Sequence, residues 1–142
     1  MKRTLFLSAM LLALTLGACQ RDSVKAQAET SDPVVVSMSK SARVKQSGEL
    51  KVTKIEDSRC PANVVCIQYG SAKVFFTLTN NGASKTGELC LGQCGSTLKS
   101  QDTAALEVGG TQFEILLTEV RPFPGTSPTP VEPEAVVKIT TR

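Results

Sequence analysis

This chain of 142 residues contains four cysteines whose spacing could allow disulfide formation or metal binding: Cys60, Cys66, Cys90 and Cys94. In an exported protein, an even number of cysteines is typical of disulfides. Three pairings are possible. Closeness in sequence and adjacent turn formers favour Cys60–Cys66 and Cys90–Cys94, whereas crossed bridges would close longer loops and stabilise the fold more.

A bridge between Cys90 and Cys94 requires the chain to turn between them. A fully extended segment of this length separates the two Cα atoms by about 13 Å, whereas a disulfide needs about 4.4–6.8 Å. Gly92 and Gly95 lie in or beside this segment and supply conformations that a turn needs.

A zinc site made by the same four thiolates is the alternative to disulfides. The pairs are separated by five and three residues, which differs from the two-residue spacing usual in structural zinc sites. Copper is disfavoured because the chain has no histidine and Met38 is the only methionine after residue 18. We therefore expect no metal and no cofactor.

The residues offer no recognisable catalytic group. The absence of histidine excludes Ser-His-Asp and Cys-His chemistry. A Ser-Lys pair or a carboxylate pair stays open, but none has a signature spacing, and the adjacent Glu56 and Asp57 would point to opposite faces of a strand. We expect a protein that is not an enzyme.

The N-terminus has the pattern of a secretory signal. Lys2 and Arg3 precede an apolar run over residues 5–16, and the small residues Gly17 and Ala18 follow. The run is shorter than the roughly 20 apolar residues that span a bilayer. Residues 1–18 are therefore predicted to be a signal peptide that is removed.

The end of this signal, Leu16-Gly17-Ala18-Cys19, resembles the bacterial lipobox. The resemblance implies that Cys19 becomes the first residue and carries acyl chains such as palmitate, and two or more chains suffice for stable anchoring. The alternative is an ordinary cleaved signal with an incidental cysteine. In enteric lipoproteins an Asp after the cysteine retains the protein in the inner membrane, so Gln20 implies the outer membrane, facing the periplasm.

The segment that follows is polar and small. Residues 20–33 contain no large hydrophobic side chain, so we expect residues 19–33 to form a flexible tether and residues 34–142 to form one domain. Removal of Lys2 and Arg3 lowers the net charge from +3 to +1. No cluster of Lys and Arg remains, so we expect no binding to nucleic acid.

The domain has the pattern of an all-β fold. Alternation is clearest over residues 72–79, a break between Val52 and Ile55 predicts a bulge, and Asn80-Asn81-Gly82 predicts a hairpin turn. We expect a small antiparallel β-sandwich or barrel linked by disulfides. Its predicted strands cover residues 34–36 at an edge, 50–55, 72–79, 85–91, 106–108, 112–120 in a central position, and 136–139.

A long proline-rich segment separates the last two predicted strands. Residues 121–134 contain five prolines, which exclude regular strand pairing. Most loops in compact domains are shorter. The segment is either a spacer without order or a docking segment for a partner.

Residues 56–70 resemble a motif of small uncharacterised bacterial lipoproteins: Asp-Ser-Arg-Cys-Pro, a spacer, Val-x-Cys, an aliphatic residue and Trp-Ala-Gly. This chain departs from the motif at Gln68 and Tyr69, where Trp and Ala are usual. The resemblance implies an envelope protein with a Cys60–Cys66 bridge, and it implies no activity.

Asp57-Ser58-Arg59 within this motif has two interpretations. In the first, Arg59 presents its donor fork to a carboxylate or phosphate of a ligand. In the second, Asp57 or Ser58 binds nearby backbone amides and Arg59 pairs with Glu56 or Asp57. Asp57, Ser58, Arg59 and Tyr69 are the candidate binding residues.

Three functions fit these patterns. The first is a non-catalytic binding module of unknown ligand, anchored to a membrane by its lipid, whose partner could be an envelope protein. The second is an inhibitor of a protease or lysozyme, and the third is a passive structural component of the envelope. The sequence indicates no oligomeric state.

Overall fold

The computed structural model describes residues 32–44 and 48–142. The predicted signal, Cys19 and the predicted tether up to residue 31 lie outside the described residues. In the described ranges, no helix is long and apolar enough to cross a membrane. The strands are β1 (Val34–Ser37), β2 (Ser41–Val44), β3 (Gly48–Asp57), β4 (Ser71–Asn80), β5 (Ala83–Cys94), β6 (Thr97–Lys99), β7 (Asp102–Val108), β8 (Thr111–Arg121) and β9 (Glu134–Thr141).

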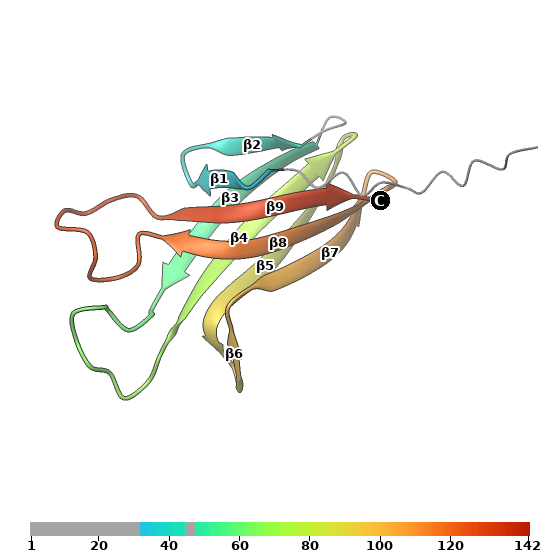
Figure 1. The fold of residues 1–142 in the computed structure, drawn as a ribbon. Helices are drawn as coiled ribbons and strands as arrows, with labels where there is room; N and C mark the ends of the chain where they lie inside the picture. Colours follow the sequence, from blue (N-terminus) through green and yellow to red (C-terminus); the bar gives the residue numbers. More distant parts are fainter. Residues whose placement is uncertain (1–31, 45–47) are drawn as a thin grey trace, which may run out of the picture.

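The strands form two antiparallel sheets that face each other as a sandwich (Figure 1). One sheet has the order β1-β9-β8-β7 and the other β2-β3-β4-β5-β6. Each sheet turns one face inward, so alternate residues are buried. In β4, Val74, Phe76 and Leu78 are buried, and from β8, Phe113, Ile115 and Leu117 meet them in the core. The predicted all-β sandwich is confirmed.

Most of the predicted strand positions are confirmed. β1 is an edge strand and β8 lies between β7 and β9. The register of β3 and β4 shifts between Val52 and Lys54, where the bulge was expected. Asn81 and Gly82 both have positive φ, at 49° and 78°, as a tight hairpin turn requires.

Two strands were not predicted from the sequence. β2 pairs with β3 over only four residues, and β6 pairs with β5 over three. Strands this short show too little alternation to be recognised. β5 is also longer than expected, because it continues to Cys94.

The ends of the sandwich differ. The end of β9 and the β4–β5 turn lie at one end. The loops of residues 58–70 and 122–133 lie together at the opposite end, at the left of Figure 1. We call this second end the loop pole. The two strands that lead into and out of the 58–70 loop, β3 and β4, are paired along almost their whole length, so the sandwich holds this loop at a fixed place.

Candidate functional site

Both predicted disulfides are present. The Cα atoms of Cys60 and Cys66 lie 5.9 Å apart, and those of Cys90 and Cys94 lie 6.0 Å apart. The crossed pairings are thereby excluded. The chain turns before Cys94 through Gly92, whose φ is +87°. Two disulfides in a domain of this size are typical of proteins that fold outside the cytoplasm.

Hydrogen bonds close the base of the 58–70 loop. The Ser58 amide donates to the Ser71 carbonyl over 2.8 Å, and the Cys60 amide donates to the Tyr69 carbonyl over 2.8 Å. The Ser58 hydroxyl donates to the same Ser71 oxygen over 3.0 Å. Together with the Cys60–Cys66 bond, these contacts fix both ends of the loop.

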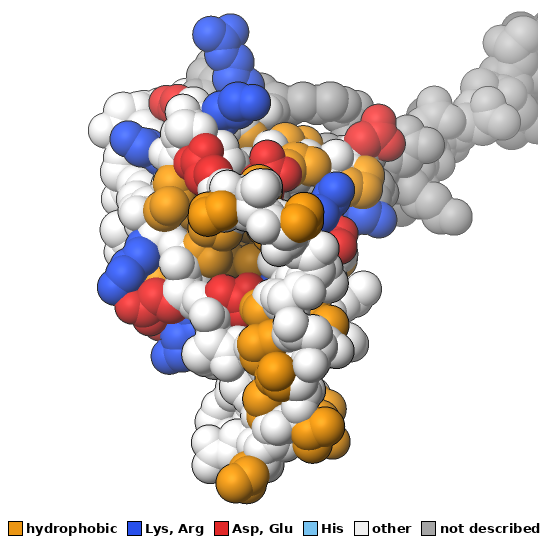
Figure 2. All heavy atoms as spheres, turned by 90° about the vertical axis from the view of Figure 1, so that its left-hand side faces the viewer, with side chains coloured by type: hydrophobic (Ala, Val, Ile, Leu, Met, Phe, Trp, Pro, Cys, Tyr) orange, Lys and Arg blue, Asp and Glu red, His pale blue; other side chains and the backbone are white. Residues whose placement is uncertain are grey.

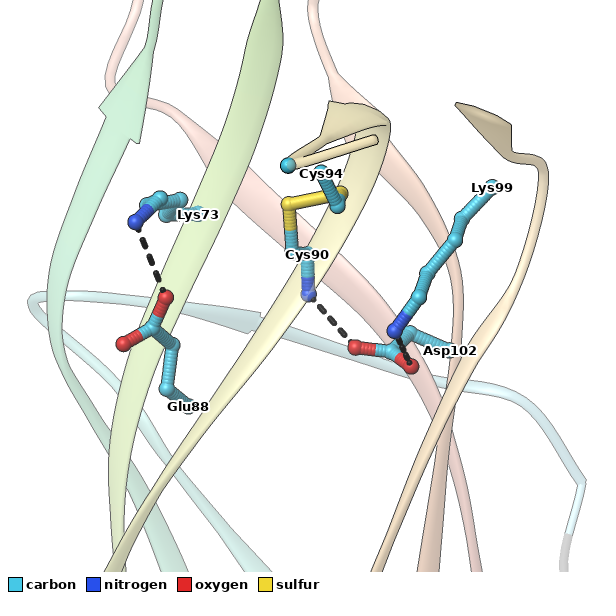
Figure 3. Close-up of a pocket in the computed structure, with 7 residues that line it drawn as sticks. Lys73, Glu88, Cys90, Cys94, Lys99 and Asp102 are labelled. Atoms are coloured by element: carbon cyan, nitrogen blue, oxygen red, sulfur yellow. Dashed lines mark hydrogen bonds and ion pairs between the residues drawn. A yellow bond between two sulfur atoms is a disulfide. The ribbon is translucent and has the colours of Figure 1, made fainter. Parts of the chain in front are cut away.

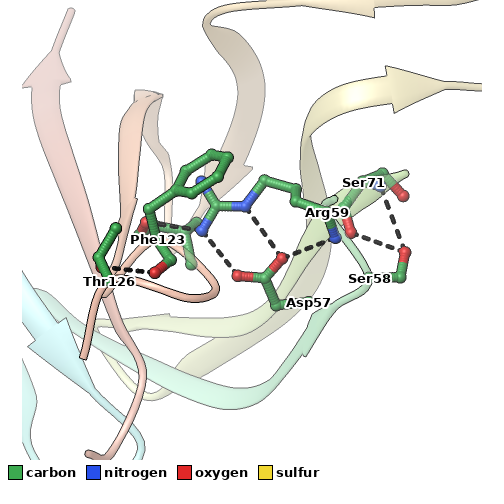
Figure 4. Close-up of polar contacts among 7 residues, drawn as sticks. Asp57, Ser58, Arg59, Ser71, Phe123 and Thr126 are labelled. Carbon is green, nitrogen blue, oxygen red and sulfur yellow. Dashed lines mark hydrogen bonds and ion pairs between the residues drawn. The ribbon is translucent and has the colours of Figure 1, made fainter. Parts of the chain in front are cut away.

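Arg59 joins this loop to the other sheet (Figure 4). Its Nε and Nη2 donate to the two carboxylate oxygens of Asp57 over 2.9 and 2.6 Å. Nη2 also donates to the Val120 carbonyl over 2.8 Å, and the guanidinium lies 4.5 Å from the centre of the Phe123 ring. The Arg59 side chain is only 10 % exposed.

These contacts are the ones that the second interpretation of Asp57-Ser58-Arg59 describes. The Arg59 donor fork is engaged by Asp57 and Val120, and Ser58 is engaged by Ser71. The structure therefore places all three candidate residues in the framework of the loop. Their role in binding stays a prediction, and it would act through the shape of the loop.

The proline-rich loop packs against the 58–70 loop. The Ala62 amide donates to the Pro124 carbonyl over 2.9 Å. A Cβ on Gly125 would lie 2.6 Å from the Asn63 side chain, so the two loops touch closely there. On the other side, Glu132 accepts hydrogen bonds from the amide and hydroxyl of Ser39 over 2.8 and 2.9 Å. The segment is thus one wall of the loop pole.

The 58–70 loop carries an exposed apolar surface. Val65 and Ile67 are 101 and 104 % exposed, Tyr69 is 72 % exposed and Val64 is 52 % exposed. No residue between positions 60 and 72 is charged, and the lower lobe in Figure 2 shows hydrophobic side chains without charged ones. We call Val64, Val65, Ile67 and Tyr69 the apolar tip.

Sequence reasoning named Tyr69 and missed the three aliphatic members of the apolar tip. Valine and isoleucine are usually buried, so their residue type alone does not predict exposure. The available signal was their place in or directly beside the short ring closed by Cys60–Cys66, which is too small to bury them.

A second candidate is a depression of about 310 Å³ beside the Cys90–Cys94 disulfide (Figure 3). Its charges are matched in pairs: Lys73 lies 3.2 Å from Glu88, and Lys99 lies 2.8 Å from Asp102. Neither lysine is left to bind an anion from solution. Its residues are Lys73, Glu88, Cys90, Cys94, Gly95, Lys99 and Asp102.

Asp102 holds this depression together. Its side chain is 17 % exposed, and this burial opposes the charged form. Hydrogen bonds from Lys99 and from the Cys90 amide (2.9 Å) outweigh the burial, so the pKa of Asp102 lies below its ordinary value of 3.8. The contacts tie β5 to β7 and have a structural role.

We expect Asp102→Asn to lower the free energy of unfolding at pH 7 by about 1 kcal/mol, because the variant loses a charged hydrogen-bond acceptor. A lowered pKa in the folded state stabilises above the unfolded value of 3.8 and stops doing so as the pH falls through the folded value. The difference between the two proteins in urea unfolding should therefore shrink below about pH 4. A difference that stays constant from pH 7 to pH 3 would contradict this role. Glu88→Gln, which breaks a half-exposed pair in the same depression, is the control with little effect.

In the part of the chain that the structure describes, no group of three or more His, Cys, Asp or Glu side chains could hold a metal ion. No protein-family model, curated protein or solved structure matches this chain. The apolar tip is therefore the strongest candidate site on geometry alone.

Proposed function

We propose that this protein is a non-catalytic binding module of the cell envelope, anchored to the outer membrane through a lipid on Cys19, and that its apolar tip binds an envelope protein. The observation that carries the proposal is the full exposure of Val65 and Ile67 on a fixed loop. Contiguous apolar side chains on a protein surface mark interaction sites. Burying these two side chains would contribute roughly 1.5–3 kcal/mol each.

The support beneath the tip favours binding. The Cys60–Cys66 bond, the hydrogen bonds at the loop base and the contacts of Arg59 hold the tip before any partner arrives. A surface that is already ordered loses little conformational freedom on binding, so more of its contact energy appears as affinity.

The position of the tip also agrees with a membrane anchor. Val34, the first residue of the domain, pairs with Val137 in the middle of β9, and β1 runs from there towards the loop pole, so the tether enters from the side away from that pole (Figure 1). A flexible tether over residues 19–33 would have a mean span of about 20 Å. The anchored domain would then direct its tip away from the membrane, towards partners in the periplasm.

The test compares capture of envelope proteins by the full-length lipidated protein and by Val65→Asp/Ile67→Asp. Both sites are fully exposed, so the double variant should fold, and its charges should lower capture of the partner at least tenfold. Leu98→Asp is the matched control, because Leu98 is 67 % exposed outside the tip. Equal capture by all three proteins would refute the proposal and would fit a passive envelope component instead.

The anchor has a separate test. We expect Cys19→Ser to abolish labelling by a radioactive fatty acid and to release the protein from the membrane fraction. Unchanged labelling would place the lipid on another residue, and unchanged sedimentation would show a different attachment.

A further inference from the structure

The backbone of the apolar tip has amides and carbonyls that are free to form hydrogen bonds with a partner. Within the described residues, the amides and carbonyls of residues 65–68 make no hydrogen bond, whereas Val64 and Tyr69 on either side do. A partner that covers the tip must therefore provide both an apolar site and groups that pair with the backbone, because buried backbone groups without partners are costly.

A lipid surface meets only the first requirement. It offers no hydrogen bonds to backbone inserted among acyl chains. The tip also lacks the Lys and Arg residues that bind anionic headgroups, since residues 60–72 carry no charge. A second copy of the tip is convex as well, so two tips offer each other no pocket. Among these possible partners, a protein with a narrow apolar cleft is the one that meets both requirements.

The cleft of an endopeptidase meets both requirements. It binds a peptide segment through main-chain hydrogen bonds and takes one side chain into a pocket, as in recognition by strand addition. Val65 offers such a side chain, because it is 101 % exposed and lies within the ring that the Cys60–Cys66 disulfide closes.

The disulfide would keep the two ends of the Val65–Cys66 peptide bond together if this bond were hydrolysed. Both residues lie in the covalent ring that Cys60–Cys66 closes. Hydrolysis would add one water, break this C–N bond and leave a carboxylate on Val65 and an amine on Cys66. The two new ends would stay joined through the disulfide, so the reverse condensation would re-form the bond and release the water. The Ile67–Gln68 bond lies outside the ring and lacks this protection.

Building on the tip as the binding site of the proposed function, we propose that the tip occupies the active-site cleft of an exported endopeptidase with an apolar specificity pocket. Val65 fills that pocket, the Val65–Cys66 bond faces the catalytic group, and the protein inhibits the enzyme. The aliphatic side chain of Val65 selects enzymes that cleave after small aliphatic residues.

The test uses the full-length protein in detergent and two probe enzymes, an elastase-type and a trypsin-type serine endopeptidase, each with a chromogenic peptide. The wild-type protein should inhibit the elastase-type enzyme and spare the trypsin-type enzyme. Val65→Lys should reverse this preference, with a change in inhibition constant of at least a hundredfold towards each enzyme. Because position 65 is fully exposed, the variant should keep the thermal midpoint of the wild type.

Two further variants show whether position 65 itself matters. Leu98→Lys and Ile67→Lys should leave the trypsin-type enzyme uninhibited, because neither places a lysine in the ring. Inhibition of the trypsin-type enzyme by Val65→Lys supports the proposal even if the elastase-type enzyme is inhibited only weakly. Three outcomes would overturn the proposal. The first is that neither the wild type nor Val65→Lys inhibits either enzyme, and the second is rapid cleavage of the loop without inhibition. The third is that Val65→Lys keeps the enzyme preference of the wild type. Loss of capture in Val65→Asp/Ile67→Asp would then still support the tip as a binding site for another protein.

Discussion

Arg59→Ala should lower the free energy of unfolding by about 3 kcal/mol. The substitution removes both hydrogen bonds to the Asp57 carboxylate, which is 17 % exposed, and leaves the Val120 carbonyl without its donor. Removing one partner of a largely buried pair is costly because the other charge stays poorly solvated. The ring of Phe123 also loses the cation that lies over it.

Urea unfolding of two further variants checks this expectation. Arg59→Lys keeps the charge but loses the planar donor fork, so it should recover only part of the loss. Arg121→Ala breaks the pair with Glu119, whose side chains are 45 and 56 % exposed, and should cost at most about 1 kcal/mol. An Arg59→Ala protein as stable as Arg121→Ala would show that Arg59 does not hold the loop pole.

Local pattern was sufficient to predict most of the strands, though not the short strands β2 and β6. In β4 every second side chain is buried, and the sequence shows this alternation because mostly polar residues lie between the buried ones, with Phe75 as the exception. The Asn81-Gly82 turn was predictable because few residues tolerate positive φ. Short-range chemistry also favoured the correct disulfides, since each joins residues that are close in the chain.

The candidate site depends on contacts that no local pattern contains. The Arg59 Nη2–Val120 hydrogen bond joins residues 61 positions apart, and the Ala62–Pro124 bond joins two loops from different sheets. The prolines of residues 121–134 predicted an irregular segment, but not its position against the 58–70 loop. The position of the apolar tip at the loop pole follows from this assembly, so no local pattern in the sequence could reveal it.

Gly70→Ala should destabilise the domain by about 3 kcal/mol or more. Gly70 has a φ of +66°, and a Cβ there would lie 1.9 Å from the carbonyl oxygen of Ser58. The contacting atom belongs to the backbone of Ser58 on the opposite side of the loop base, so it cannot move aside as a side-chain atom could. The hydrogen bonds from the Ser58 and Cys60 amides must break or lengthen to admit the methyl group.

Gly82→Ala separates the two contributions to this loss. Gly82 has a similar φ of +78°, but a Cβ there would have no atom within 4 Å. It should cost only the conformational strain of about 1 kcal/mol. Hydrogen exchange at the Ser58 and Cys60 amides should accelerate in Gly70→Ala and stay unchanged in Gly82→Ala. If both variants lost the same free energy of unfolding, the loop base would adjust to the added methyl group at no extra cost. A loop base that adjusts so easily could not keep Val65 in a fixed position before a partner binds.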